Sequence, residues 1–344
     1  MRKYFLPLVC VAGLYGTEPP AANHISYDTD LFKKDTKAIF FNAEALCWTV
    51  DEGALDYAIK MDGPGWASTE AYSSGSIENA TFNWEPGFRL NVGYFNAPHY
   101  WDAYLEYTYF VDHGSNSATR PTGAGEFLNG TWAQPDPNVT SFIGLAEAHS
   151  QIHFHYNMLD LIATRRFHPN EHFRIRLAGG ATVAWLRQDW KVHYRDQENE
   201  KSRIRNHWRF TGAGLRLALM LDWFLGKWNV YFTGKTSVAL LGGQYHNVAK
   251  QTTTLSPTNI PMRNAHLHDT RLALHWQFLA GPSWQKAFGS VRTELFLGYE
   301  FNAWSNLHEI IRSTQASPAA AKELWYNMSL IGIQGVTFRW NLDF

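Results

Sequence analysis

Residues 336–344 close the chain with the sequence Val336-Thr337-Phe338-Arg339-Trp340-Asn341-Leu342-Asp343-Phe344. Apolar side chains occupy every second position, and polar side chains fill the positions between them. An extended strand of this composition has one apolar face and one polar face. The edge strand of a soluble β-sandwich can show the same alternation. The choice between a membrane barrel and a soluble sandwich therefore depends on the rest of the chain.

The same two-sided pattern recurs upstream, and charged residues mark its polar face. Between Phe173 and Trp185, apolar residues alternate with a second set that includes Arg174 and Arg176. An arginine that faces lipid at the bilayer midplane costs roughly 2–4 kcal/mol. The pattern predicts an all-β fold, an antiparallel transmembrane β-barrel whose strands face lipid and lumen alternately. In such a barrel the aromatic end of the chain is expected to act as the insertion signal read by the barrel-assembly machinery; its residues are Val336, Phe338, Trp340, Leu342 and Phe344.

The composition agrees with a barrel surrounded by outer-membrane lipid. Aromatic residues make up 15% of the chain and charged residues 18%, with a formal net charge of −1. Aromatic girdles and few exposed ions are typical of membrane barrels. The near-neutral charge gives no reason to expect a nucleic-acid partner. After the amino-terminal region no apolar run reaches the about 18 residues that a transmembrane helix needs.

The amino-terminus predicts export. Arg2 and Lys3 precede an apolar stretch from Phe5 to Tyr15 that is too short to span a bilayer. We expect a signal peptide over residues 1–22, a periplasmic lead-in over 23–36 and a barrel over 37–344. Removal of the signal takes Cys10 with it and leaves Cys47 alone, so no internal disulfide is expected.

The connections are expected to alternate between short periplasmic turns and long external loops. Long loops are predicted at residues 51–83, 113–145, 189–206, 243–269 and 302–322, and short turns at 96–99, 165–172, 225–227 and 281–289. This parity gives about ten strands, or twelve if residues 55–60 and a partner also span. Residues 55–60 alternate, so a pair of short strands is the other interpretation of segment 51–83. At Asp160 the alternation slips by one position, which suggests a bulge or the periplasmic rim.

The polar face of the strands predicts which side chains line the lumen. The expected lining residues are Glu44, Arg89, Asp102, Glu106, Arg174, Arg176, Arg216, Lys235, Arg271, Arg292, Glu294 and Glu300, with Arg339 and Asp343 on the last strand. About ten strands enclose a space only slightly wider than an eight-stranded barrel filled by side chains. The expectation is a narrow passage for ions and small solutes, partly occluded by residues 51–83.

Two other kinds of chemistry have weaker support in the sequence. His149, His153 and His155 share one parity, but no cysteine or carboxylate cluster completes a metal site around them. Ser150 beside His149, and Ser237, lack a convincing base and orienting group for hydrolysis. We therefore expect no enzyme activity, no metal and no cofactor.

Several short segments resemble a known family. They are Phe41-Asn42-Ala43-Glu44-Ala45-Leu46, Leu55-Asp56-Tyr57-Ala58-Ile59, Gly298-Tyr299-Glu300-Phe301 with Trp304, and Gly335-Val336-Thr337-Phe338-Arg339. Together with the Asp343-Phe344 end, they are similar to pore-forming outer-membrane proteins of the type of the major outer membrane protein of Legionella and of Chlamydia-related bacteria. The resemblance implies an outer-membrane porin and brings no catalytic residues. Unlike the cysteine-rich chlamydial members, the mature chain would hold only Cys47.

The resulting expectation is a porin for ions and small solutes. The alternative is a non-conducting structural or adhesive barrel that binds partners through residues 113–145 and 243–269. The lipid-facing surface also leaves a homo-oligomer open.

Overall fold

The computed structural model describes residues 37–62, 74–96, 100–123, 126–132, 144–170, 172–197, 199–225, 229–255, 258–288, 291–312 and 325–344. The expected signal peptide and lead-in lie outside these residues. The described chain is all-β, and no helix in it is long and apolar enough to cross a membrane. Its strands are β1 (Lys37–Glu52), β2 (Asp56–Asp62), β3 (Ser74–Asn79), β4 (Glu85–Asn96), β5 (Trp101–Thr119), β6 (Phe127–Gly130), β7 (Leu145–Asn170), β8 (Phe173–Asp196), β9 (Lys201–Phe224), β10 (Val230–Leu255), β11 (Thr258–Phe288), β12 (Val291–Arg312) and β13 (Trp325–Asp343).

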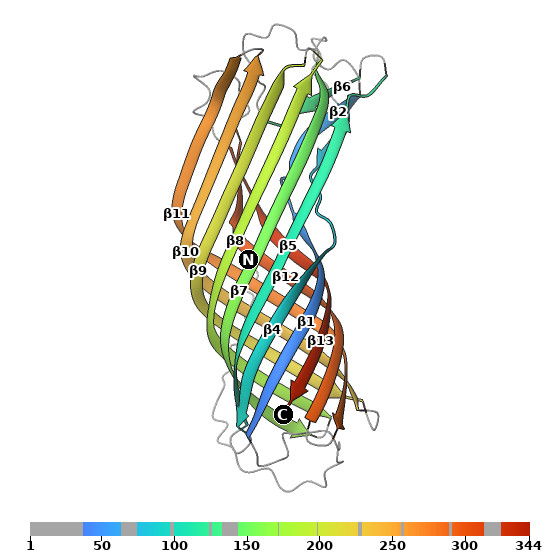
Figure 1. Cartoon of the computed structure of the whole chain (residues 1–344), viewed down its shortest axis with the longest axis vertical. Coiled ribbons are helices and arrows are strands. Elements are labelled where there is room, and N and C mark those ends of the chain that lie inside the picture. Colours follow the sequence, from blue (N-terminus) through green and yellow to red (C-terminus); the bar gives the residue numbers. More distant parts are fainter. Residues whose placement is uncertain are drawn as a thin grey trace, which may run out of the picture.

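Ten of these strands close into a barrel. The pairing runs β7-β5-β4-β1-β13-β12-β11-β10-β9-β8, and β8 pairs with β7 to complete the ring, with every pairing antiparallel. Figure 1 shows the tilted strands of this ring and the carboxyl-terminus at its lower end. The prediction of an antiparallel barrel of about ten strands is confirmed.

A belt of apolar side chains surrounds the lower part of the barrel. On β9 the outward residues from Ala213 to Trp223 are apolar at every second position, and Leu215 and Leu217 are each 72% exposed. Ten residues of strand rise about 34 Å, and a tilt of roughly 45° reduces this to about 24 Å. That height matches the ~25 Å apolar band of outer-membrane barrels. Below, "lower" means the end that holds Phe344, and "upper" means the opposite end.

Above the belt the polarity of the wall inverts while the strands continue. On β8 the outward residues are first Phe173, Ile175, Leu177, Ala181, Val183 and Trp185, and then Arg187, Asp189, Lys191, His193 and Arg195. The inward residues change in the opposite sense, from Arg174, Arg176, Ala178, Gly180 and Thr182 to Ala184, Leu186, Gln188, Trp190, Val192 and Tyr194. The upper wall therefore stands in water and encloses an apolar interior.

This inversion overturns most of the predicted loops. Segment 189–206 is the end of β8 and the start of β9, and 243–269 is a long hairpin of β10 and β11. Segment 113–145 contains the end of β5 and β6, and 302–312 belongs to β12. These segments carry charged residues on their outward face. Charged residues of a strand are expected to face the lumen, so the sequence pattern predicts loops in these segments. The predicted turns at 165–172 and 281–289 were also too long, since β7 continues to Asn170 and β11 to Phe288.

Strand β7 has no phase slip at Asp160. Its pairing with β8 is unbroken from Glu147 to Phe167, and its pairing with β5 is unbroken from Glu147 to Arg165. Tyr156, Met158 and Asp160 therefore all face inward. The change from Met158 to Asp160 is the same inversion of polarity that β8 shows. The predicted bulge or rim was therefore wrong.

The described parts of segment 51–83, residues 51–62 and 74–83, lie at the upper mouth of the barrel and include short strands (Figure 1). Strand β2 pairs with β3 and with β6, and β6 joins the barrel through Leu128 and Leu145 of β7. Leu55, Tyr57 and Ala58 are buried. Below, the insert means β2, β3 and β6.

The terminal strand lies inside the sheet rather than at an edge. Strand β13 pairs with β1 on one side and with β12 on the other. Val336, Phe338, Trp340 and Phe344 are exposed on the outer surface, and Leu342 is partly buried on the same parity. These side chains continue the apolar belt around the seam where the ring closes.

Candidate functional site in the lumen

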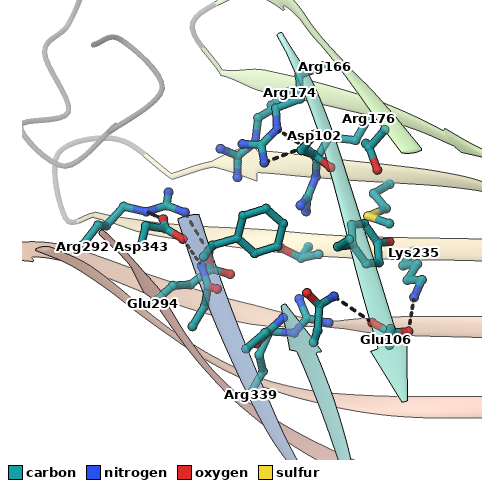
Figure 2. Close-up of a pocket in the computed structure, with 18 residues that line it drawn as sticks. Asp102, Glu106, Arg166, Arg174, Arg176, Lys235, Arg292, Glu294, Arg339 and Asp343 are labelled. Carbon is teal, nitrogen blue, oxygen red and sulfur yellow. Dashed lines mark hydrogen bonds and ion pairs between the residues drawn. The ribbon is translucent and has the colours of Figure 1, made fainter. Parts of the chain in front are cut away.

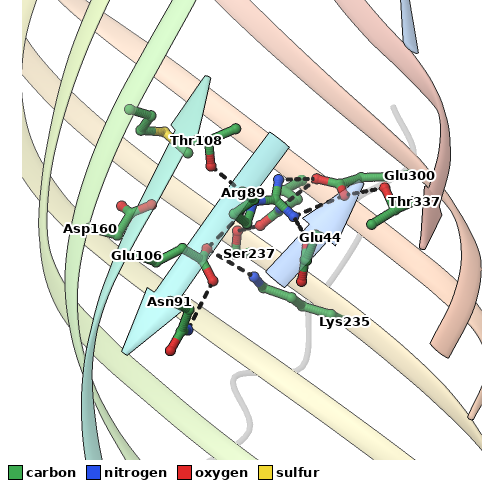
Figure 3. A network of polar contacts seen from close by, with 12 residues as sticks. Glu44, Arg89, Asn91, Glu106, Thr108, Asp160, Lys235, Ser237, Glu300 and Thr337 are labelled. Carbon is green, nitrogen blue, oxygen red and sulfur yellow. Dashed lines mark hydrogen bonds and ion pairs between the residues drawn. The ribbon is translucent and has the colours of Figure 1, made fainter. Parts of the chain in front are cut away.

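The membrane-level lumen is organised around the guanidinium group of Arg89. Its Nη1 lies 2.5 Å from Oε2 of Glu44, its Nη2 lies 2.8 Å from Oε1 of Glu300, and its Nε donates to Thr108 Oγ1 at 2.9 Å. The Arg89 side chain is only 1% exposed. Figure 3 shows these groups converging from β1, β4, β5 and β12. Arg339 of β13 binds the other oxygen of Glu44, with Nε at 2.6 Å from Oε1.

Two further ion pairs extend this network across the lumen. Lys235 Nζ lies 3.9 Å from Oε1 of Glu106, and Arg216 Nε lies 3.3 Å from Oδ1 of Asp160. Arg216 also donates from Nη2 to His275 Nδ1 at 2.9 Å. The network joins opposite walls of the barrel and leaves no wide path between them.

The lower lumen holds a second group of ion pairs around Asp222. Arg174 Nε lies 2.8 Å and Arg176 Nη2 3.1 Å from its carboxylate, and Thr233 Oγ1 donates to it at 2.8 Å. A cavity of about 70 Å³ lies in this region, with room for a few water molecules. Figure 2 shows its charged lining, which is Asp102, Glu106, Arg166, Arg174, Arg176, Lys235, Arg292, Glu294, Arg339 and Asp343.

The structure places every predicted lining residue inside the barrel and pairs it with an opposite charge. Further pairs include Arg166–Asp102, Arg292–Asp343, Arg292–Glu294, Arg271–Glu309 and Arg89–Glu106. Sequence reasoning missed Asp160, Arg166 and Asp222, which lie on the same inward parity. Continuing the even-numbered series from Arg216 reaches Asp222. With these three included, the inward charges of the lower lumen nearly balance.

Above the ions, a block of apolar side chains crosses the whole lumen. Every strand of the ring except β4 contributes to this block, which contains Leu46, Trp48, Val50, Phe110, Phe154, Tyr156, Met158, Ala184, Leu186, Trp208, Phe210, Ala239, Leu241, Tyr245, Ala273, Trp304, Leu307, Ile331 and Ile333. We call it the apolar block. Aromatic rings meet within it, with Trp48 against Phe110 at 5.6 Å and Trp208 against Tyr245 at 5.9 Å.

Exposing the apolar block to water would cost a large free energy. Each fully buried large apolar side chain contributes roughly 1.5–3 kcal/mol through removal from water. Exposing Trp48, Trp208 and Trp304 alone would cost at least roughly 5–9 kcal/mol, which approaches the whole stability of an ordinary domain. These side chains belong to strands of the ring itself. Movement of a loop or of a plug segment therefore cannot remove them from the lumen. The described barrel is therefore closed at this level.

The insert lies in the mouth above the block. Arg312 of β12 holds it, with Nη1 at 2.6 Å from Asp56 Oδ2 and Nη2 at 2.6 Å from the Ala54 carbonyl oxygen. The same guanidinium group lies 5.0 Å from the ring centre of Trp132 and 5.7 Å from that of Trp190. A cation beside two indole rings adds to the ionic contact.

The histidines and serines considered for chemistry are not brought together. His149, His153 and His155 occupy outward positions on the upper half of β7, outside the lumen, and His113 stacks on His153 at 6.2 Å. No group of three or more potential metal ligands occurs within the described ranges. Ser150 faces inward and accepts a hydrogen bond from Trp190 Nε1 at 2.8 Å, so it points away from His149. Ser237 donates to Gln277 Oε1 at 3.0 Å.

Comparison with known proteins gives one clear match. The model of a family described as "Legionella pneumophila major outer membrane protein precursor" matches residues 34–342. A search of curated proteins found no match. Among solved structures, the outer membrane protease OmpT from Escherichia coli is 6% identical, with coverage of 91% of this chain and 99% of that chain and a TM-score of 0.39. The Ralstonia pickettii toluene transporter TbuX is 8% identical, with coverage of 90% and 89% and a TM-score of 0.27. Likenesses this distant carry no argument about activity.

Proposed function

This chain belongs to the family of the Legionella pneumophila major outer membrane protein and lies in the bacterial outer membrane, and we propose that it works there as a closed, non-conducting barrel. In this role it anchors a rigid polar wall that rises above the membrane, where partners bind. The upper wall is the set of outward residues of β7 to β11 above the apolar belt.

The apolar block is the observation that carries this proposal. It lies across the path of any solute, and its side chains come from nine of the ten ring strands. A partner-binding wall needs rigidity, and packed side chains inside the upper barrel provide it. No catalytic role is included, because Ser150 and Ser237 form hydrogen bonds with Trp190 and Gln277 rather than with a histidine.

Single-channel recording in planar bilayers tests the proposal. The folded protein is expected to insert without producing conductance steps. Insertion is verified separately, by protease protection in liposomes. Stable steps from the wild-type protein would overturn the closed barrel.

A small-solute porin is the second candidate, and the lower lumen favours it. The lumen below the block contains ion pairs and a small cavity. Apolar packing is often at least as stabilising as buried ion pairs, so stability alone does not explain why this part of the lumen is charged. Conduction would require the block to rearrange. If steps occur, Arg176→Gln, which removes one cation from the cavity, should shift the reversal potential towards cation preference. An unchanged reversal potential would exclude the cavity from the conducting path.

A further inference from the structure

Five basic side chains form a row across the outer face of the barrel. His155, Arg187, Arg209, His246 and His268 are direct cross-strand partners on β7, β8, β9, β10 and β11. All five occupy outward positions, and Arg187, Arg209 and His268 are exposed. We call this set the basic row.

The centre of the basic row, Arg187 and Arg209, lies at the upper edge of the apolar belt. Arg187 is the first outward residue after Trp185, and Arg209 is the second after Ala213. One outward step along a tilted strand rises about 5 Å along the membrane normal. The polar headgroup layer is about 5–7 Å thick on each side of the hydrocarbon. Arg187 therefore lies at the level of the lipid headgroups, and the long side chain of Arg209, one outward step higher, can reach down to it.

The charge around the basic row is unbalanced. Arg187 and Arg209 stand directly opposite each other, an arrangement that is unfavourable without a counter-charge. The carboxylates at described outward positions of β7 to β11 above the belt are Glu147 and Asp189, and both already bind arginines: Glu147 lies 2.8 Å from Arg195, and Asp189 accepts from Arg205 Nε at 3.1 Å.

The neighbouring arginines contribute to the lowered pKa values of two histidines in the row. Partial burial, and then the charge of Arg187, lowers the pKa of His155; desolvation, and then Arg209 and His268, lowers the pKa of His246. Arg187 Nη2 donates to His155 Nε2 at 2.9 Å, which also favours the neutral ring. An anion bound between these strands would offset the charge of Arg187 and Arg209 at the two histidine rings.

We propose that Arg187 and Arg209, at the centre of the basic row, bind the phosphate groups of anionic lipids in the outer leaflet of the membrane. Two observations favour a lipid over a dissolved anion. Arg187 and Arg209 lie at headgroup level, and the apolar belt farther round the barrel, on β10 to β13, is hollowed by a groove of about 430 Å³ lined by Thr236, Leu274, Trp276, Phe278 and Phe301 among others. Bound lipid phosphates supply the counter-charge that Arg187 and Arg209 lack.

The test measures binding of lipid A, a diphosphorylated glycolipid, to the full-length folded protein in mixed detergent micelles. Thermophoresis gives the affinity, and native mass spectrometry gives the number of lipids retained. The wild-type protein should bind lipid A saturably and bind dephosphorylated lipid A at least about tenfold more weakly. Inorganic phosphate at the same concentration should neither bind nor compete. Equal binding of the dephosphorylated lipid, or saturable binding of inorganic phosphate, would overturn the proposal.

Two double variants with equal charge change locate the site. Arg187→Gln with Arg209→Gln should weaken lipid A binding by about 30-fold, since each basic side chain near an anionic surface contributes about fivefold. Lys201→Gln with Arg203→Gln removes two outward cations near the top of β9 and should change the affinity less than about threefold. Equal losses in the two variants would overturn the proposal. Rising salt should weaken lipid A binding by the wild-type protein, and salt-independent binding would contradict it even if a variant failed to fold.

Discussion

Arg312, the last described residue of β12, binds Asp56, the first residue of β2, at 2.6 Å. Because the ends of two distant segments meet here, this pair fixes the insert in the mouth of the barrel. The Arg312 side chain is 6% exposed, so its charge interacts in a site largely closed to solvent.

Arg312→Ala should loosen the insert. Loss of the guanidinium group leaves Asp56 and the Ala54 carbonyl oxygen without this donor, at an expected cost of about 2–4 kcal/mol. Hydrogen exchange should then speed up at Tyr57 and Ala58 while the barrel strands stay protected. Lys60→Ala removes a more exposed pair with Glu78 on the same insert and should cost less than about 1 kcal/mol. Equal exchange in both variants would show that Arg312 does not hold the insert.

Arg89→Met should strongly destabilise the barrel. The change leaves the carboxylates of Glu44 and Glu300 buried and short of positive charge, and breaking a buried network in this way costs about 3–5 kcal/mol. Urea unfolding in detergent measures the loss. The exposed pair of Arg205 and Asp189 provides the control, because Arg205→Gln should change the stability by less than about 1 kcal/mol. A loss below about 1 kcal/mol for Arg89→Met would mean that the network does not organise the lumen.

Gly214→Ala and Gly242→Ala should differ sharply, although the two glycines lie on neighbouring strands. A Cβ atom at Gly214 would overlap the carbonyl oxygen of Leu240 and lie 2.7 Å from the Cα of Leu241, so the β9–β10 pairing must shift. A Cβ atom at Gly242 meets no atom within 4 Å. We expect Gly214→Ala to lower the yield of folded barrel, as measured by heat-modifiable gel mobility, and Gly242→Ala to leave it unchanged. Equal yields would show that close strand approach is not needed at Gly214.

Asp112 should make the stability of the upper barrel depend on pH. Burial raises its pKa from 3.8 to about 7, although the backbone amides of Val50 and Asn83 donate to its carboxylate at 2.9 and 3.3 Å. The folded state therefore keeps a proton that the unfolded chain has lost between pH 4 and 7. This contribution to stability is full below about pH 4 and is lost as the pH rises to about 7, by at most about 1.4 kcal/mol per pH unit.

Asp112→Asn should remove that part of the pH dependence. Unfolding by urea at several pH values between 4 and 8 measures the slope for both proteins. The variant should show a flatter profile over this window, and the slopes of the two proteins should differ most at about pH 5.4, midway between the two pKa values. Identical profiles would show that Asp112 titrates in the folded protein as it does in the unfolded chain.

Alternation alone predicted the ten-stranded ring and the inward position of the charged residues. Arg174 and Arg176 identify the lumen because the lower wall faces lipid on its other side. The same rule fails at Arg187 and Lys191, where the outside is polar and the inside is packed. A reading that followed Leu186, Trp190, Val192 and Tyr194 as one apolar series would have extended β8 to its observed end.

The pairing partners within the lumen could not be predicted, because they join residues far apart in sequence. The contacts of Arg89 with Glu44 and Glu300 depend on the order of strands in the ring and on how far neighbouring strands are staggered. Likewise, nothing local to Arg312 indicates that it reaches Asp56. The apolar block was missed for the same reason, since its side chains meet only when the ring closes.

Cysteine labelling on β8 tests the filled upper lumen most directly. In a background with Cys47→Ser, which removes the one free cysteine of the described chain, single cysteines replace the neighbours Leu186 and Arg187. The folded protein in liposomes is treated with a membrane-impermeant maleimide. The apolar block predicts fast labelling at position 187 and strong protection at position 186, with both positions reactive after unfolding. Fast labelling at position 186 in the folded barrel would reveal a water-filled lumen and contradict the closed barrel.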